Sequence, residues 1–329
     1  MSPEEDLRKI RQDRDLSVTD IVSVDPLSPG DLDLIFSLSR KFRGYGTYKF
    51  NFNKGCSMVH AFFESSTRTL SSFDLAAKNL SMDTNSVSSG GSSLNKGEGF
   101  LDTILTLDAY NLKAITIRSR ESGVPEMMAR HTNAAIINAG DGWHEHPTQA
   151  LLDSLTMLDH FGGGHLEGKS VTIVGDVRHS RVFGSLVRIL RTLKADIRVC
   201  APETLLPAGI ENFEVQTFYD VEDGLKNADV VYALRVQEER GSGGYIPTLR
   251  EYSKMFGISR ERLNLAAQNA ILMHPGPVRR DVDIHSALVT LDEKSHILNQ
   301  VENGMAVRKA LLWLLCDRYD GKRKEIRRL

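Results

Sequence analysis

Residues 169–201 read KSVTIVGDVRHSRVFGSLVRILRTLKADIRVCA and hold the pattern that decides the fold. An apolar run fills most of 169–176, apolar residues recur every three or four positions over 181–193, and a second apolar run follows over 196–201. A continuous apolar run is typical of a strand buried on both faces, and the wider spacing is typical of an amphipathic helix. The stretch therefore predicts two parallel strands joined by a helix.

The same succession of strand, turn and helix occurs twice earlier in the chain. The first instance pairs a predicted strand over 58–63 with a helix over 70–80. The second pairs a strand over 135–138 with a helix over 148–161, whose first turn suits Pro147. Further strands are predicted over 114–118, 228–236 and 269–275. This alternation predicts an α/β fold with two doubly wound parallel-sheet domains, joined by the long helix that ends at 161.

A chain of 329 residues is too long for one ordinary hydrophobic core, so we expect two domains. A glycine-rich break at 162–164 follows the joining helix and is the best candidate for a boundary. We assign residues 1–150 to the first domain and residues 151–300 to the second. A terminal helix within 301–329 is expected to pack back on the first domain.

The composition excludes several classes of protein. With 41 Lys and Arg against 43 Asp and Glu, the formal charge of -2 predicts no basic surface for nucleic acid. No run of about 18 uncharged apolar residues occurs, so no membrane span is expected. The 3 cysteines lie far apart and support neither a disulfide framework nor a zinc ribbon. We therefore expect a cytoplasmic protein.

Hydroxyl side chains and one arginine follow the first predicted strand, at Ser66, Thr67, Arg68 and Thr69. A helix that starts here offers unpaired N–H groups and the positive end of its dipole, and a guanidinium matches a phosphate. The segment therefore predicts a phosphate-binding site. A plain helix cap beside an exposed arginine is the alternative interpretation.

Two other motifs are rejected on their context. Gly163, Gly168, Lys169 and Ser170 have the spacing of a P-loop, but here the motif follows a helix and leads into a strand. The turn after residue 174 also lacks the G-x-G-x-x-G pattern of dinucleotide-binding proteins. Neither an ATPase nor an oxidoreductase is therefore predicted.

Three further residues lie where predicted strands end. His146 precedes Pro147 and could face the sheet edge or simply cap the next helix, and these alternatives stay open. Its neighbour His144 does not share a helix face with it, so we expect no metal site. Arg181 and Arg235 each follow a strand, which suggests an anion site, although a solvated surface arginine is the alternative for each.

Six motifs, in a fixed order along the chain, give it a specific resemblance to one known protein family. They are FFESSTRT at 62–69, SLNKGE at 93–98, NAGDG followed by HPTQALLD over 138–153, VGD followed by HSR over 174–181, RVQEER at 235–240 and HPGPVRRDVDI at 274–284. Together they resemble the aspartate carbamoyltransferase family, from about residue 20 onward. The resemblance implies no metal or organic cofactor, and homotrimers whose active sites are shared between subunits and between a carbamoyl-phosphate domain and an aspartate domain.

The resemblance also implies roles for individual residues. The phosphate of carbamoyl phosphate would be held by Ser66, Thr67, Arg68, Thr69 and Arg118. The carbamoyl group would face His146, Gln149 and the backbone around Gly276 and Pro277. Ser93, or its neighbour Ser92, and Lys96 would enter from the adjacent subunit. L-Aspartate would be held by Arg181, Arg235 and Gln237, and Glu64 would pair with Arg240 when the domains close.

This chemistry suits the residue types. An uncharged amine attacks the carbamoyl carbon, and phosphate leaves after a tetrahedral oxyanion has formed, so the site needs oriented donors rather than a nucleophile. We expect Arg118, Thr69 and His146 to donate to that oxygen, and Arg68 to assist the leaving phosphate.

The chain also departs from the family pattern. The usual second arginine of S-T-R-T-R is Leu70, and the first 15 or so residues have no counterpart. An ornithine carbamoyltransferase would show an HCLP-type segment and an SMG loop, whereas this chain has HPGP and no SMG. A catalytically inactive scaffold subunit is a further alternative, which the presence of Arg68, His146, Arg181 and Arg235 disfavours. A regulatory chain or a dihydroorotase remains a possible partner.

Overall fold

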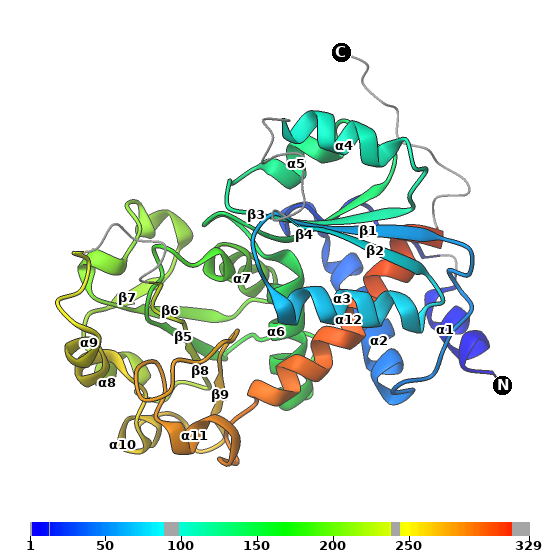
Figure 1. Ribbon diagram of the computed structural model, residues 1–329. Helices are drawn as coiled ribbons and strands as arrows, with labels where there is room; N and C mark the ends of the chain where they lie inside the picture. Colours follow the sequence, from blue (N-terminus) through cyan, green and yellow to red (C-terminus); the bar gives the residue numbers. More distant parts are fainter. Residues whose placement is uncertain (1, 13, 89–98, 238–243, 318–329) are drawn as a thin grey trace. The chain divides into compact units, whose positions relative to one another are not determined.

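The computed structural model describes residues 2–12, 14–88, 99–237 and 244–317 (Figure 1). The chain divides into two compact units, the first built from residues up to Leu152 together with those from Glu302 onward, and the second from Asp153–Val301. Two helices carry the chain from one unit to the other, namely α6 (Pro147–Phe161) and α12 (Ile297–Asp317). No described helix is long and apolar enough to cross a membrane.

The first unit contains a parallel sheet of 4 strands in the order β2-β1-β3-β4. The strands are β1 (Ser57–Phe62), β2 (Asp83–Ser88), β3 (Ala114–Ser119) and β4 (Ala135–Asp141). The crossovers contain α3 (Thr67–Asn79), α4 (Phe100–Asp108) and α5 (Val124–Ala129). Parallel strands need such crossovers, and their carboxyl ends therefore lie at one edge of the sheet.

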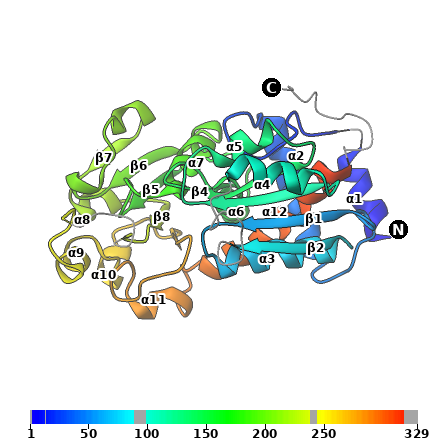
Figure 2. The ribbon, with the colours of Figure 1, turned by 45° about the horizontal axis from the view of Figure 1, so that its top comes forward.

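Helices cover both faces of this sheet (Figure 1, Figure 2). On one face, Ile104 of α4 and Met128 of α5 pack with Ile115 and Ile117 of β3, and none of these four residues is exposed to solvent. On the opposite face lie α3 and α12. Burial on both faces explains why β1, β3 and β4 have almost continuous apolar sequences.

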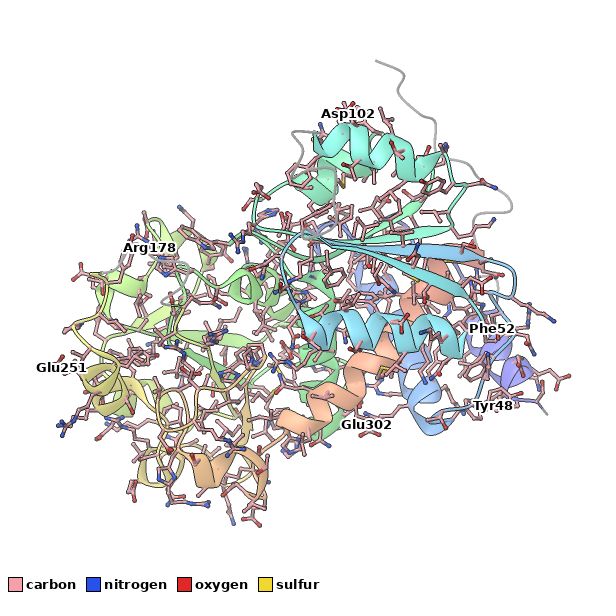
Figure 3. All side chains as sticks on the ribbon, in the orientation of Figure 1. Tyr48, Phe52, Asp102, Arg178, Glu251 and Glu302 are labelled. Carbon is pink, nitrogen blue, oxygen red and sulfur yellow. The ribbon has the colours of Figure 1, made fainter. Side chains whose placement is uncertain are left out.

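An aromatic cluster joins the last helix to the start of the chain. Trp313 of α12 stacks on Phe52 with ring centroids 4.3 Å apart and meets Phe42 edge-on at 6.0 Å. Phe42 belongs to α2 (Pro29–Gly44), and α1 (Pro3–Arg11) places the guanidinium of Arg11 5.2 Å from the Trp313 ring centroid. Figure 3 shows Phe52 and Tyr48 beside these first helices. The first residues of the chain thus form α1, whose Arg11 lies over Trp313.

The second unit contains a parallel sheet of 5 strands in the order β7-β6-β5-β8-β9. The strands are β5 (Ser170–Val174), β6 (Asp196–Cys200), β7 (Gln216–Phe218), β8 (Val230–Ala233) and β9 (Ile271–Met273). The α-helices are α7 (Arg181–Thr192), α8 (Val221–Leu225), α9 (Leu249–Phe256), α10 (Arg260–Leu263) and α11 (Ser286–Thr290), with 3-10 turns at Glu203–Leu205 and Ile210–Phe213. The prediction of two parallel α/β sheets is confirmed.

A buried histidine makes the stability of the first unit depend on pH. His60 lies in the middle of β1 with no solvent exposure, and its Nδ1 is 2.7 Å from Thr116 Oγ1. Burial lowers the pKa of His60 to about 4, although the nearby Asp74 opposes this shift. Because the unfolded chain binds a proton near pH 6.5 and the folded chain does not, stability is fully present above pH 6.5 and is lost as pH falls toward 4.

We therefore expect the unfolding free energy to fall by about 2 kcal/mol between pH 7 and pH 5 on account of His60. Urea titrations at both pH values check this in the wild type and in His60→Asn, whose amide still reaches Thr116. The difference in unfolding free energy between the two pH values should be smaller in this variant. His165→Asn removes an exposed histidine and should keep the wild-type difference. An unchanged pH dependence in His60→Asn would contradict this assignment.

Candidate active site

The turn between β1 and α3 leaves the start of that helix open. Ser66 occupies the cap position and makes no side-chain cap bond, and its Oγ donates to Thr69 Oγ1 at 3.0 Å. Arg68 is exposed in the first turn, and that turn carries no acidic side chain. Ser66 therefore lacks the cap hydrogen bond of the plain cap alternative, whereas the exposed arginine of that alternative is observed, and the helix begins at Thr67, three residues before its predicted start. An open helix N-terminus with a nearby guanidinium suits an anion.

Arg118 lies at the same edge of the sheet, at the end of β3. It is opposite Phe62, the last residue of β1, and its Nη1 donates to Ala139 O of β4 at 2.9 Å. Its Nε lies 3.4 Å from Glu64 Oε2, and both side chains are largely buried. These contacts fix the guanidinium at the ends of three adjacent strands.

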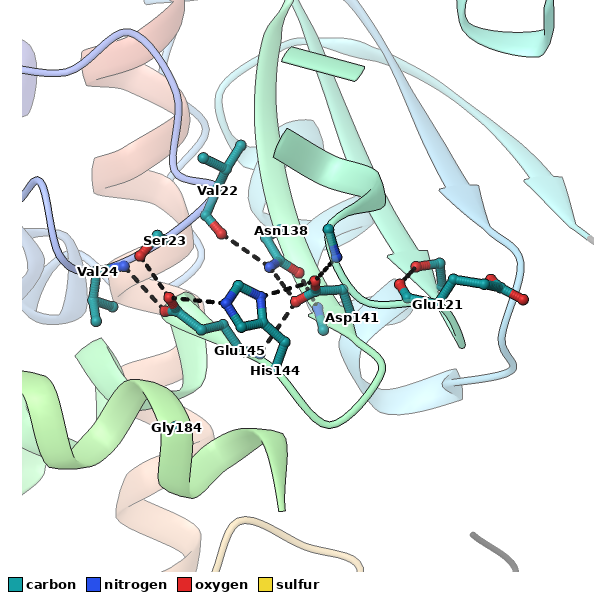
Figure 4. Close-up of polar contacts among 12 residues, drawn as sticks. Val22, Ser23, Val24, Glu121, Asn138, Asp141, His144, Glu145 and Gly184 are labelled. Carbon is teal, nitrogen blue, oxygen red and sulfur yellow. Dashed lines mark hydrogen bonds and ion pairs between the residues drawn. The ribbon is translucent and has the colours of Figure 1, made fainter. Parts of the chain in front are cut away.

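Asp141, at the end of β4, organises the next turn (Figure 4). Its Oδ1 accepts from Asn138 Nδ2 at 2.7 Å and from the Glu145 N–H at 3.2 Å. Its Oδ2 accepts from the Gly123 N–H at 2.7 Å and lies 3.1 Å from His144 Nδ1. Burial alone would raise the pKa of Asp141, but these hydrogen bonds outweigh it and lower the pKa. The turn is thus held by a buried carboxylate.

His146 follows this turn directly and precedes α6. The turn is also held by Glu145, whose Oε1 accepts from Ser23 Oγ at 2.5 Å and whose Oε2 accepts from the Val24 N–H at 3.1 Å. The His146 carbonyl accepts from the Gln149 N–H at 3.0 Å, and both of these side chains are buried. His146 and Gln149 therefore belong to the same sheet edge as Arg118. Among the described residues, no three metal-binding side chains are grouped.

Other predicted residues cannot be placed. Ser92, Ser93, Lys96 and Arg240 lie outside the described residues. The pairing of Glu64 with Arg240 therefore stays a prediction, and Arg118 is one partner of Glu64 in the structure.

The second unit brings a separate set of predicted residues to the edge of its own sheet. Arg181 is the first residue of α7 and is only 4% exposed, so the solvated surface alternative is wrong for it. Just before it, His179 Nδ1 lies 2.8 Å from Asp176 Oδ1. The other oxygen of Asp176 accepts from the Gln237 N–H at 3.0 Å. Asp176 thus ties the segment before Arg181 to the segment after β8.

A second buried carboxylate, Asp283, holds the segments that follow β8 and β9. Its Oδ1 accepts from the N–H of Val236 at 3.3 Å, next to the half-buried Arg235. Its Oδ2 lies 3.1 Å from His274 Nε2 and accepts from the Arg279 N–H at 2.9 Å. Arg235 and the segment that contains Gly276 and Pro277 are therefore fixed through one side chain.

The segment after β9 presents an unusual set of backbone groups. Pro275 and Pro277 have no N–H, and the Gly276 N–H donates to His274 Nδ1 at 2.8 Å. The peptide bond between Gly276 and Pro277 is cis. Only carbonyl oxygens of 275–277 are left to meet a ligand, so this segment suits a ligand that donates hydrogen bonds.

Sequence reasoning missed the buried carboxylates Asp141, Asp176 and Asp283. Each is at most 2% exposed, although aspartate is rarely buried without partners. For Asp141 and Asp176 the signal was an acidic residue at or just beyond a buried strand, as in VGD, whereas the bonds from Gln237 to Asp176 and from Val236 to Asp283 join distant parts of the chain.

Comparison with known proteins agrees with the two units. Residues 19–159 match the family of the aspartate/ornithine carbamoyltransferase carbamoyl-P binding domain, and residues 167–315 match that of the Asp/Orn binding domain. The chain belongs to the aspartate/ornithine carbamoyltransferase family. Within this family it is 43% identical to the aspartate carbamoyltransferase catalytic subunit of Maricaulis maris, over 90% of this chain and 92% of the relative. The Nocardioides sp. subunit is 45% identical over 90% of this chain and 93% of its own length.

Solved structures of carbamoyltransferases share the fold. The aspartate transcarbamoylase of Trypanosoma cruzi, in complex with carbamoyl phosphate, superposes with a TM-score of 0.81 at 29% identity, covering 90% of this chain and 96% of that chain. The ornithine carbamoyltransferase of Thermus thermophilus also gives a TM-score of 0.81, at 23% identity, over 91% of this chain and 99% of that one. At that identity the second likeness concerns the fold alone.

Proposed function

We infer that this chain is a catalytic chain of aspartate carbamoyltransferase. It transfers the carbamoyl group of carbamoyl phosphate to the amine of L-aspartate, giving N-carbamoyl-aspartate and phosphate for pyrimidine biosynthesis. The observation that carries this inference is the similarity to curated catalytic subunits of this enzyme, at 43% and 45% identity over 90% of the chain. In this proposal residues 1–150 bind carbamoyl phosphate and residues 151–300 bind aspartate.

The phosphate group would lie at the start of α3. The hydroxyls of Ser66, Thr67 and Thr69 and the guanidinium of Arg68 supply donors there, and the open helix end adds backbone N–H groups and a favourable dipole. The replacement of the usual second arginine by Leu70 leaves Arg68 as the cation of this turn. A charge-assisted contact here stabilises the phosphate as it leaves.

The carbamoyl group would be polarised by donors from three strand ends. Arg118, Thr69 and His146 would donate to its oxygen, which becomes an oxyanion when the aspartate amine attacks. Because Arg118 is held by Ala139 O and Glu64, its guanidinium is oriented before the substrate binds. The carbamoyl NH2 would donate to Gln149 and to the carbonyl oxygens around Gly276 and Pro277.

The aspartate carboxylates would be held by Arg181 and Arg235, with Gln237 beside them. Planar guanidinium groups bind carboxylates through two parallel hydrogen bonds. The buried carboxylates Asp176 and Asp283 support this assignment, since each holds the backbone next to one of these side chains. Two cations would also repel an amino acid with a cationic side chain.

The assembly and compartment are further parts of the proposal. We propose a homotrimer in which Ser93 and Lys96 enter the neighbouring site, and a closed state in which Glu64 exchanges its contact with Arg118 for Arg240. A regulatory chain or a dihydroorotase is a possible partner of the trimer. The three cysteines all lie in the described part of the chain and form no disulfide, and Cys200 and Cys316 are buried, which supports a cytoplasmic enzyme.

A colorimetric assay for ureido products tests the function. With carbamoyl phosphate present, we expect aspartate to be carbamoylated and ornithine to be left unreacted, because ornithine would place a second cation beside Arg181 and Arg235. Light scattering on the same sample checks the trimer mass. Comparable turnover of both amino acids would contradict the assignment of these two arginines.

A further inference from the structure

A buried hydrogen-bonded chain in the second unit is not used by the proposed mechanism. It starts at Asp153 of α6, which has no solvent exposure. Asp153 Oδ2 accepts from Tyr232 Oη of β8 at 2.6 Å, and Asp153 Oδ1 accepts from Gln300 Nε2 of α12 at 2.7 Å. Tyr232 is fully buried and Gln300 is 2% exposed, so water does not compete for these bonds.

The carboxylate sets the direction of every bond in this chain. Both oxygens of Asp153 accept, one from Tyr232 and one from Gln300, so Gln300 turns its NH2 toward Asp153 and its oxygen away. Burial, and then the charge of Asp153, raise the pKa of Tyr232 well above its usual value, which keeps the hydroxyl a donor. Asp153 therefore fixes which end of the Gln300 amide faces outward.

The outward end of Gln300 holds the segment that follows β9. Gln300 Oε1 accepts from the His274 N–H at 2.9 Å. The His274 ring then accepts from the Gly276 N–H at Nδ1, so its hydrogen is on Nε2 and is donated to Asp283. If the amide of Gln300 were reversed, its NH2 would face the His274 N–H and the bond would be lost. The carbonyl oxygens of 275–277 are thus aimed by a chain that ends at Asp153.

We propose that Asp153 and Gln300 are positioning residues for carbamoyl transfer, which hold His274 so that the carbonyl oxygens of 275–277 meet the NH2 of carbamoyl phosphate. This inference rests on the proposed function. A displacement of about 1 Å at a reacting group costs on the order of 10²-fold in rate, so a residue that touches no substrate has a measurable effect.

The test uses a ligand that lacks the NH2 group. Gln300→Met keeps the side-chain length and removes both hydrogen bonds. We expect KM for carbamoyl phosphate to rise about tenfold or more and kcat to fall by about 10- to 100-fold. Acetyl phosphate carries a methyl group in place of NH2, so its inhibition constant should stay within about twofold of the wild-type value.

Control variants separate positioning from loss of stability. Thr172→Val removes another fully buried hydrogen bond of the same unit, from Thr172 Oγ1 to Gly224 O at 2.8 Å, and should change neither constant. Asp153→Asn keeps an acceptor for Gln300, so its kinetics should be closer to the wild type than those of Asp153→Leu. If Gln300→Met does not fold, the comparison of Asp153→Asn with Asp153→Leu tests the same positioning role.

The outcomes distinguish the two proposals. If the wild type fails to carbamoylate aspartate, the proposed function is wrong. If the wild type is active but Gln300→Met and Asp153→Leu leave the ratio of carbamoyl phosphate KM to acetyl phosphate inhibition constant unchanged, the positioning role is overturned. The ratio stays unchanged when both constants change by the same factor, and this result would show a general disturbance of the site.

Discussion

Arg68→Ala should lower kcat/KM by about 10²- to 10³-fold, the cost of one donor to developing charge in a preorganised site. Arg68 is exposed in the first turn of α3, where Ser66 provides no side-chain cap bond. The substitution should therefore remove stabilisation of the leaving phosphate and leave the packing of the helix unchanged. Steady-state kinetics with saturating aspartate measure the effect, and thermal unfolding without substrate should show no change in Tm.

Two matched variants make this result specific. Arg68→Lys keeps a cation without the planar fork and should recover only part of the lost activity. Arg130→Ala removes an exposed arginine of the same unit, paired with Glu126, and should leave kinetics unchanged. Activity of Arg68→Ala within a few-fold of the wild type would exclude Arg68 from the site.

Arg235→Ala should lower kcat/KM for aspartate by about 10²-fold or more, because truncating one partner of a buried charge pair costs roughly 2–5 kcal/mol. The binding of carbamoyl phosphate should be almost unaffected, since the proposed phosphate donors belong to the other unit. Aspartate saturation curves and a separate calorimetric titration with a stable phosphonate analogue of carbamoyl phosphate check the two parts of this expectation.

The controls for Arg235 follow the same logic. Arg235→Lys should bind aspartate more weakly than the wild type and more tightly than Arg235→Ala. Arg191→Ala removes an exposed arginine of α7 that pairs with Glu214, and should match the wild type. Equal loss of affinity for both substrates in Arg235→Ala would show that the variant disturbs more than the aspartate site.

The sequence predicts those strands that are buried on both faces. β1, β3 and β5 lie within one or two residues of their predicted bounds, whereas β4 extends three residues further and β8 is shorter than predicted at both ends. β2 reads DTNSVS and β7 has three residues, and both are edge strands of their sheets. β4 and β9 are edge strands too, but their residues are buried and mostly apolar, so β2 and β7 were missed because they lack an apolar run and not because they lie at an edge.

In the candidate site too, the sequence could predict some residues and not others. Ser66 to Thr69 could be placed because polar residues after a buried strand must lie at the carboxyl edge of a parallel sheet, whereas Arg118 was assigned only through the family resemblance. The carboxylates that hold the site could not be identified, since Asp283 joins His274 to Val236 and Asp153 joins α6 to α12. Such partners are far apart in sequence, and only the folded chain brings them together.

The position of Trp313 has a consequence for synthesis on the ribosome. The first unit is interrupted by the whole of the second and is completed only by α12. Until that helix leaves the exit tunnel, Phe42 and Phe52 lack the indole that packs against them, and the carbonyls of Phe42 and Gly46 lack the ammonium of Lys309. The inserted unit is synthesised without such a gap, so during translation it is the one able to fold first. Until α12 is made, the aromatic side chains that it covers in the folded first unit stay exposed.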